Sequence, residues 1–283
     1  MPAAPDGAWV RPLAAARPGA RLRLLCFHPA GGGPALFRGW SAALPEDVEV
    51  LAVQLPGREG RLAEPCLTGF PEAVKRLHAA LRPWLDRPYA LFGHSMGALL
   101  AYGVAMAAAR HGDRTPAGLL VSGAGGPGSP RDRRGRAYWS ERELVAELRS
   151  MGGTPEEVLA DRDLLSVVLP TLRADYAICD SFRRPAGPPL DCPVSVFGGQ
   201  DDDSVPVGDL RRWSDTTRGE SSVRLFPGGH FFLTAPSAAA VLAAVAADLA
   251  ALAARTAVAD PSDRTDLSDR TARETAGTRS DVT

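Results

Sequence analysis

The sequence has few cysteines and no cysteine pair of the kind that binds metal. Its four cysteines are scattered over 283 residues, at Cys26, Cys66, Cys179 and Cys192, and no two form a C-x-x-C motif. This spacing argues against a disulfide scaffold and against a zinc site. We therefore expect a protein without a metal or another cofactor, in the reducing environment of the cytoplasm.

The sequence also lacks an excess of charge of either sign. It has 32 basic and 33 acidic residues, a balance that gives no field to attract nucleic acid or an anionic membrane. Lys75 is the only lysine, and we assign no function to this bias. Residues 1–20 contain no continuous apolar segment of a signal peptide, and no uncharged stretch is long enough to cross a bilayer. We expect no nucleic-acid partner, no membrane and a monomer.

Short apolar runs alternate with helical segments along most of the chain. This alternation predicts an α/β fold with a mostly parallel central sheet and helices on both faces. The apolar content of 45% is enough for one large core. The predicted strands are residues 21–27, 48–54, 89–93, 118–122, 193–198 and 223–226.

Residues 124–190 interrupt this alternation and predict a helical lid inserted into the core. One helix is expected over 140–150, where Ser140 and Glu143 have the spacing of a capping box, and another over 163–182 with a break at Pro170. About sixty residues is far more than a crossover connection needs. We expect an N-terminal extension at 1–20, the core at 21–123 and 191–255, and a disordered tail at 256–283.

The most informative stretch is an apolar strand that leads directly into Gly93-His-Ser95-Met-Gly97. This is a G-x-S-x-G nucleophile elbow, in which a sharp turn between strand and helix exposes a serine hydroxyl to a general base. The helix expected over 98–110 directs its positive N-terminal end at Ser95. Ser95 is therefore the candidate nucleophile.

The base for Ser95 is expected downstream of it, because the catalytic residues of this architecture follow in the order Ser, Asp or Glu, His. His28, His78 and His94 lie upstream, and His111 lies at the far end of the elbow helix. Only His230 remains, in a glycine-rich loop after the last predicted strand. His230 is therefore the candidate base.

The acid that orients His230 should follow the predicted strand at 193–198. Three adjacent carboxylates, Asp201, Asp202 and Asp203, follow that strand, and spacing alone does not choose among them. The chosen carboxylate would accept the Nδ1 proton of His230 and stabilise the imidazolium that forms during catalysis.

An oxyanion hole requires two backbone amides. The amide of Met96, directly after the nucleophile, is the first candidate, and Ala30 in the glycine-rich loop after the first predicted strand is the second.

With these residues identified, the chain resembles the stand-alone type II (editing) thioesterases of the α/β-hydrolase superfamily, which accompany modular polyketide and nonribosomal peptide synthetases. The resemblance spans about residues 21–252 and is carried by eight motifs in order. They are CFHPAGG at 26–32, FRGW at 37–40, LPGRE at 55–59, GHSMGA at 93–98, MGGTPE at 151–156, LPTLRAD at 169–175, FGGQDD at 197–202 and GGHFFL at 228–233.

The resemblance implies more than spacing does. The family pattern places the catalytic aspartate three residues after a pair of glycines, which implies Asp202. It also implies a substrate held as a thioester on the phosphopantetheine arm of an acyl carrier or peptidyl carrier protein, from which stalled or aberrant acyl groups are hydrolysed.

Two other functions fit the same residues. A carboxylesterase or lipase acting on small oxygen esters would share every catalytic residue named above. A non-catalytic module that binds carrier proteins could retain the elbow only as architecture.

Overall fold

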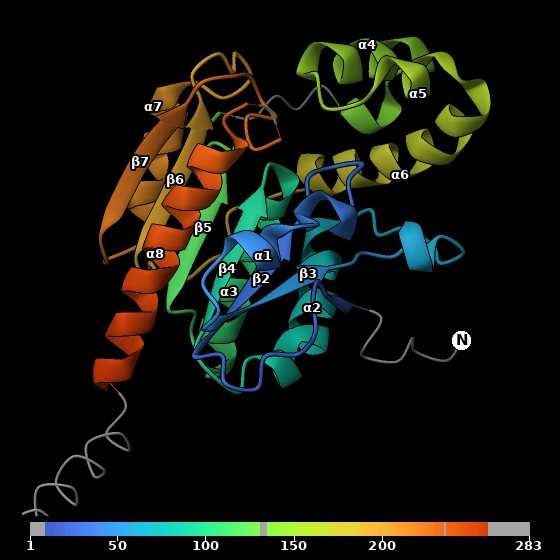
Figure 1. Ribbon diagram of the computed structural model, residues 1–283. Helices are drawn as coiled ribbons and strands as arrows, with labels where there is room; N and C mark the ends of the chain where they lie inside the picture. Colours follow the sequence, from blue (N-terminus) through green and yellow to red (C-terminus); the bar gives the residue numbers. More distant parts are fainter. Residues whose placement is uncertain (1–8, 131–134, 235, 260–283) are drawn as a thin grey trace, which may run out of the picture.

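The computed structural model describes residues 9–130, 135–234 and 236–259. Its centre is a seven-stranded sheet in the order β1-β3-β2-β4-β5-β6-β7 (Figure 1). All neighbouring strands are parallel except the pair β1 and β3. The predicted mostly parallel sheet is therefore confirmed. The strands are β1 Val10–Pro12, β2 Leu22–Phe27, β3 Val48–Val53, β4 Tyr89–His94, β5 Gly118–Ser122, β6 Val194–Gly199 and β7 Ser221–Phe226.

The central strands β2, β4 and β5 are largely apolar because both faces of the sheet are buried there. Side chains alternate between the faces: in β4, Leu91 points into one hydrophobic cluster and Phe92 into the other. Helices α2 (Phe70–Leu81) and α3 (Met96–His111) cover the first face, and α1 (Trp40–Ala43) and α8 (Ala238–Ala259) cover the second. The expected covering of both faces is confirmed. Shorter elements are η2 Pro34–Phe37, η3 Glu59–Arg61, η4 Arg82–Trp84, α7 Val207–Arg211 and η6 Arg212–Thr216.

A helical insertion lies between β5 and β6 and forms a separate layer beside the carboxyl ends of the strands (Figure 1). It contains η5 Arg136–Tyr138, α4 Glu141–Met151, α5 Glu156–Ala160 and α6 Arg162–Asp180. Helices α4, α5 and α6 share a small hydrophobic cluster of their own, made of Leu144, Leu148, Leu159, Leu165, Leu169, Leu172 and Tyr176.

The sequence correctly predicted the start of one helix of the insertion and wrongly predicted a break in another. Ser140 and Glu143 form the predicted capping box at the start of α4. The expected break at Pro170 is absent, because α6 continues through this residue. A proline inside a helix costs about 3 kcal/mol, and the burial of Leu165, Leu169 and Leu172 on either side of Pro170 offsets that cost.

Both ends of the core extend beyond the predicted boundaries. Residues 10–12, assigned to an N-terminal extension, form β1 and pair with β3 at the edge of the sheet. A strand of three residues that ends in proline is too short to show an alternating pattern. Helix α8 ends at Ala259 rather than at residue 255. Residues 1–8 and the predicted disordered tail from 260 onward lie outside the described residues.

Within the described part of the chain, only the segment Ala238–Ala257 of α8 is long and apolar enough to cross a membrane. Its residues Val241, Val245 and Leu249 are buried against the sheet. Its single acidic residue, Asp248, pairs with Arg224 of β7. Core helices pass the same test of length and composition, so this feature is weak support for a membrane span.

Candidate active site

Ser95 occupies a sharp turn between β4 and α3. Its backbone has φ 54° and ψ −117°, and among the described residues only Glu59 is another non-glycine residue with positive φ. The Ser95 amide donates a hydrogen bond of 2.8 Å to the carbonyl of Ser122 in β5. Such backbone strain is concentrated at functional sites, and here it lifts the hydroxyl above the carboxyl ends of the strands.

The glycines on either side of Ser95 are required by close backbone contacts. A Cβ on Gly93 would lie 2.2 Å from the carbonyl oxygen of Gly97, and a Cβ on Gly97 would lie 2.1 Å from the carbonyl oxygen of Phe27. These contacts bring the elbow directly against the end of β2 and the loop that follows it.

His230 lies in the loop after β7, and its side chain is 6% exposed. Its Nδ1 is 2.8 Å from Oδ2 of Asp202. With the proton on Nδ1, the imidazole donates to this carboxylate and leaves the lone pair of Nε2 available to accept a proton. The structure therefore brings the predicted base and the predicted acid into contact.

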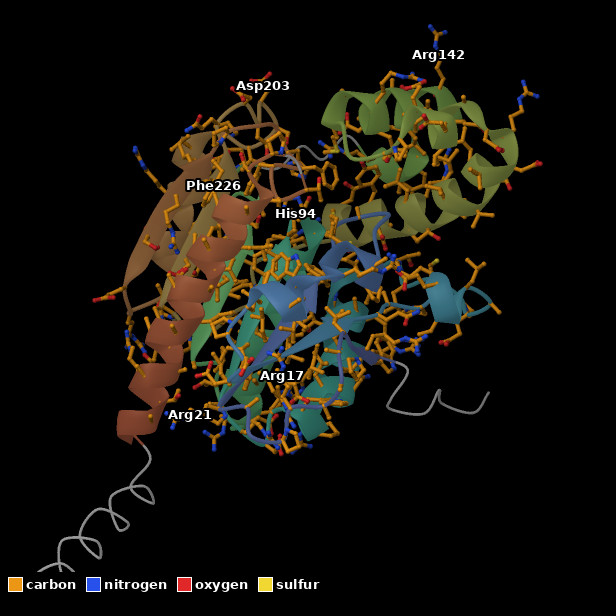
Figure 2. The ribbon with its side chains drawn as sticks, viewed as in Figure 1. Arg17, Arg21, His94, Arg142, Asp203 and Phe226 are labelled. Atoms are coloured by element: carbon orange, nitrogen blue, oxygen red, sulfur yellow. The ribbon has the colours of Figure 1, made fainter. Side chains whose placement is uncertain are left out.

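The geometry distinguishes the three adjacent aspartates. Asp202 faces His230, and its side chain is 3% exposed. Asp201 accepts a hydrogen bond of 3.2 Å from the amide of Gly228 and so holds the loop that carries His230. Asp203 is exposed and points away from the molecule (Figure 2).

The environment of Asp202 favours its ionised form. Burial raises the pKa of the Asp202 carboxyl, but hydrogen bonds from His230 and Ser204 and the attraction of His230 outweigh burial and leave this pKa below its ordinary value. The carboxylate therefore stays charged at neutral pH, as an orienting group for an imidazole requires.

Ser204 is a site residue that the sequence analysis missed. Its hydroxyl donates to Oδ1 of Asp202 at 2.5 Å, and its amide donates to the same oxygen at 3.0 Å. The hydroxyl oxygen also lies 3.3 Å from Nδ1 of His230. A serine two residues after an aspartate is typical of a turn closed by the aspartate side chain, and this spacing was the available signal.

Ser95, Met96 and His230 line one cavity of about 180 Å³. The core contributes one wall, and the insertion contributes Arg136, Met151, Cys179 and Asp180. No described group of three or more His, Cys, Asp or Glu side chains has the arrangement of a metal site. The cavity thus combines a hydroxyl, an imidazole with its carboxylate, and a mixed polar and apolar surface from the helical layer.

The two candidate oxyanion donors lie on adjoining segments. Met96 is the first residue of α3, where an amide has no acceptor within the helix. Ala30 lies in the loop after β2 and packs against both the main core and the cluster of the insertion. Ala30 is not among the residues that line the cavity of Ser95. Its loop reaches the elbow through the approach of Phe27 to Gly97.

Two buried histidines beside the site are held neutral. Burial lowers the pKa of His94 well below its ordinary value, and the nearby His230 lowers it further. The ring centroids of His94 and His230 are 5.1 Å apart. Burial and the charge of Arg58 lower the pKa of His28 to about 3. Neither ring therefore competes for the proton that the proposed base accepts.

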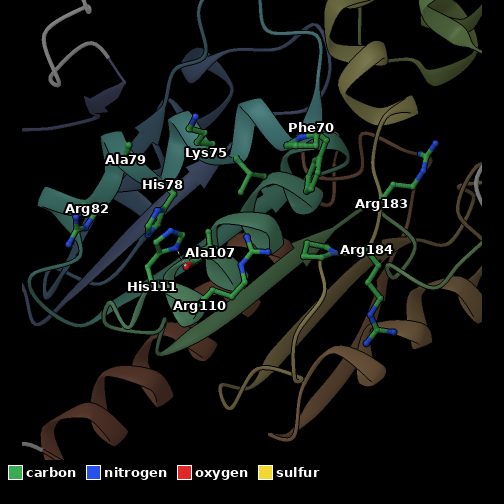
Figure 3. A pocket seen from close by; sticks show the side chains of 13 residues that line it. Phe70, Lys75, His78, Ala79, Arg82, Ala107, Arg110, His111, Arg183 and Arg184 are labelled. Carbon is green, nitrogen blue, oxygen red and sulfur yellow. Dashed lines mark hydrogen bonds between the residues drawn. The ribbon is translucent and has the colours of Figure 1, made fainter.

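A larger groove of about 690 Å³ lies elsewhere, between α2 and α3 (Figure 3). His111 lies there, at the opposite end of α3 from Ser95, and a helix of this length spans roughly 24 Å. Its Nδ1 is 2.8 Å from the carbonyl of Ala107, and Nε2 of the neighbouring His78 is 2.7 Å from Asp113. No serine or cysteine lines this groove, so it is separate from the candidate active site.

Comparison with known proteins agrees with this geometry. A family model for the thioesterase domain matches residues 22–249. The gramicidin S biosynthesis protein GrsT of Aneurinibacillus migulanus is 40% identical over 214 residues, which cover 76% of this chain and 84% of GrsT. The thioesterase PikA5 of Streptomyces venezuelae is 39% identical over 230 residues, 81% of each chain.

A solved structure agrees as well. The type II thioesterase BorB, from the borrelidin biosynthetic cluster, superposes with a TM-score of 0.77 at 38% identity and covers 84% of this chain and 96% of its own. The predicted α/β-hydrolase architecture is thereby confirmed. The family match spans most of the chain and includes both the elbow and the histidine loop, so the chain belongs to the thioesterase family of thioester hydrolases.

Proposed function

We propose that this thioesterase hydrolyses acyl groups from the phosphopantetheine arm of acyl carrier or peptidyl carrier proteins, and so clears stalled or aberrant chains from polyketide or nonribosomal peptide synthetases. The observation that carries the proposal is the contact of His230 with Asp202 beside the cavity that Ser95 lines. The relatives GrsT and BorB, a gramicidin S biosynthesis protein and a type II thioesterase of a biosynthetic cluster, support this substrate class. We place the enzyme in the cytoplasm, as a monomer.

The proposed reaction proceeds through an acyl-enzyme. His230 Nε2 takes the proton of the Ser95 hydroxyl as the oxygen attacks the thioester carbonyl, and Asp202 stabilises the resulting imidazolium. The amides of Ala30 and Met96 hold the oxyanion. Collapse of the intermediate breaks the C–S bond, and the His230 imidazolium gives its proton to the departing thiolate, which leaves as the thiol. His230 then activates a water molecule that releases the carboxylic acid from Ser95.

The helical insertion is the proposed lid. It supplies Met151 and Arg136 to the cavity wall, so its position sets how much space an acyl group has. The cavity of about 180 Å³ is below the range of roughly 300–1,000 Å³ that is common for ligand pockets. We therefore expect the insertion to move outward when a long acyl chain enters. An apolar pocket separates substrates that differ by one methylene by only about 1–3 kcal/mol, which suits an editing enzyme of broad selectivity.

The substrate class can be tested by comparing three acyl donors with the same acyl group: an acyl carrier protein, its N-acetylcysteamine thioester and its p-nitrophenyl ester. We expect the highest kcat/KM on the carrier protein. An advantage of several orders of magnitude for the oxygen ester would instead identify a carboxylesterase and remove the editing function.

The nucleophile can be tested by labelling with a fluorophosphonate. Wild-type protein should be labelled, and Ser95→Ala should abolish both labelling and hydrolysis. Ser129 provides a matched control, because it is another serine that lines the same cavity, and Ser129→Ala should retain labelling. Folded wild-type protein that resists labelling would support the non-catalytic carrier-binding module instead.

A further inference from the structure

A buried ion pair joins the helical insertion to the core beside the candidate active site. Arg58, in the loop after β3, meets Asp175 of α6 through two parallel contacts, Nη1 to Oδ2 at 2.7 Å and Nη2 to Oδ1 at 2.8 Å. The side chain of Arg58 is 6% exposed and that of Asp175 is fully buried. This two-pronged geometry fixes the relative orientation of the two groups as well as their separation.

Both members of the pair also bind the loop after β2. The amide of Gly31 donates to Oδ2 of Asp175 at 2.8 Å, and Nη1 of Arg58 donates to the carbonyl of Gly32 at 3.1 Å. These two glycines directly follow Ala30, the proposed second oxyanion donor. The ion pair therefore holds the residues next to Ala30 through one amide and one carbonyl.

The same helix contacts these loops at two neighbouring positions. Thr171, about one turn before Asp175, donates from its hydroxyl to the carbonyl of Gly57 at 2.9 Å. Leu172 lies 3.1 Å from where a Cβ on Gly31 would be, and Gly31 has φ +71°. The loop after β2 is thus confined by α6 and has little room to shift independently of the insertion.

Stability alone does not account for this pair. Removing two charges from water costs several kcal/mol for each ion, and well-packed apolar replacements of buried pairs are often neutral or stabilising. What a two-pronged buried pair supplies is a fixed geometry. That geometry is supplied next to a backbone amide whose catalytic value depends on its position.

We propose that Arg58 and Asp175 are positioning residues for the loop after β2, which carries Ala30. Through this ion pair, the position of the helical insertion on the core controls how well the Ala30 amide stabilises negative charge at Ser95. The inference rests on the proposed acyl-enzyme mechanism. Neither Arg58 nor Asp175 is among the residues that line the cavity of Ser95, so both would act through the backbone of residues 30–32.

We expect substitution of either residue to weaken the stabilisation of the transition state rather than the binding of substrate. Removal of one oxyanion donor lowers kcat by roughly 10²–10³-fold, and displacement of a donor should lower kcat by a smaller factor. We expect Asp175→Asn, which keeps the size of the side chain and one acceptor for Gly31, to lower kcat by about 10–100-fold with little change in KM. Arg58→Lys keeps the charge but loses the planar fork, and it should behave similarly.

The decisive readout compares two inhibitors with the same acyl chain. A trifluoromethyl ketone forms an oxyanion on Ser95 and needs the amides, whereas a non-hydrolysable thioether analogue binds without forming one. In Asp175→Asn and Arg58→Lys, affinity for the ketone should fall in proportion to kcat/KM, and affinity for the thioether should stay within about twofold of wild type. The ratio of ketone affinity to thioether affinity should change because a transition-state analogue depends on interactions that the enzyme makes in the transition state.

Two further variants separate positioning from folding. The double variant Arg58→Met/Asp175→Leu leaves no unpaired buried charge, so it should fold even if a single variant does not, and it should still bind the ketone poorly. Glu49→Gln breaks the ion pair of Arg23 and Glu49 on β2 and β3, which is also largely buried, and it should leave the ratio of the two affinities unchanged.

Three outcomes would overturn the inference. The first is a folded double variant that retains the wild-type ratio of ketone to thioether affinity. The second is an equal loss of this ratio in Glu49→Gln, which would make the effect a general response to lost ion pairs. The third is wild-type protein that forms no adduct at Ser95, which would overturn the proposed acyl-enzyme mechanism itself and this inference with it.

Discussion

Ser204 and Asp202 are joined by two hydrogen bonds to one carboxylate oxygen, from the hydroxyl at 2.5 Å and from the amide at 3.0 Å. The other oxygen of Asp202 faces His230. One side of the carboxylate is thus fixed by a local turn while the other side orients the proposed base. This division explains how an aspartate in a surface turn can hold an imidazole in a defined position.

The Ser204 hydroxyl is expected to contribute modestly to catalysis. Ser204→Ala removes one of the two hydrogen bonds to Oδ1 but keeps the amide, and Ser204 is exposed, so water can replace the hydroxyl. We expect kcat/KM to fall by about three- to tenfold, within the roughly 0.5–1.5 kcal/mol of a typical hydrogen bond. Steady-state kinetics on an N-acetylcysteamine thioester would measure this. If Ser204→Ala had the same kcat/KM as wild type, the Ser204 amide alone would be sufficient to fix Asp202.

Gly97 is expected to tolerate no side chain. In Gly97→Ala the new Cβ would lie 2.1 Å from the carbonyl oxygen of Phe27, so either the elbow or the loop after β2 must move. We expect a loss of at least about 2 kcal/mol in the free energy of unfolding, measured in urea, and a larger loss of kcat. Gly128→Ala is the matched control, because a Cβ there meets nothing within 4 Å. Equal effects of the two variants would contradict the steric argument.

His28 should make stability depend on pH. Burial and the charge of Arg58 lower its pKa from 6.5 to about 3 in the folded protein, so between these values the unfolded chain binds one more proton. The contribution of His28 to the free energy of unfolding is therefore fully present above pH 6.5. It is lost as the pH falls toward 3, by about 1.4 kcal/mol per pH unit. In His28→Gln, the free energy of unfolding should decline less steeply over this range.

Urea titrations at several pH values between 4 and 6.5 would measure wild-type protein and His28→Gln. An unchanged slope in His28→Gln would mean that the ring is not held neutral in the folded protein.

Local sequence patterns predicted those features of the molecule that are formed by residues close together in the sequence. The strand before Ser95 and the glycines around it predicted the elbow, because a strained turn needs particular residues at fixed spacing. His230 followed by exclusion from chain order. The ion pair of Arg58 with Asp175 joins residues 117 positions apart, and no local pattern indicates which charged side chains will meet. Only the packing of α6 on the core brings these two side chains together.

The choice among the three aspartates gives the sharpest test of the site. Spacing left Asp201, Asp202 and Asp203 equivalent, whereas in the structure only the side chain of Asp202 contacts His230. Asp202→Asn retains the size of the side chain but favours the wrong imidazole tautomer, and we expect kcat to fall by about 10⁴-fold, as for the corresponding change in a serine protease.

The neighbouring aspartates serve as matched controls for Asp202→Asn. Asp203→Asn should have wild-type activity because this side chain is exposed. Asp201→Asn should have a small effect, since Asp201 acts only by holding the Gly228 amide at 3.2 Å. Fluorophosphonate labelling rates and steady-state kinetics of the three variants would rank them. A larger loss at 201 or 203 than at 202 would refute the assignment, because the hydrogen bond to His230 would then not be the one that catalysis uses.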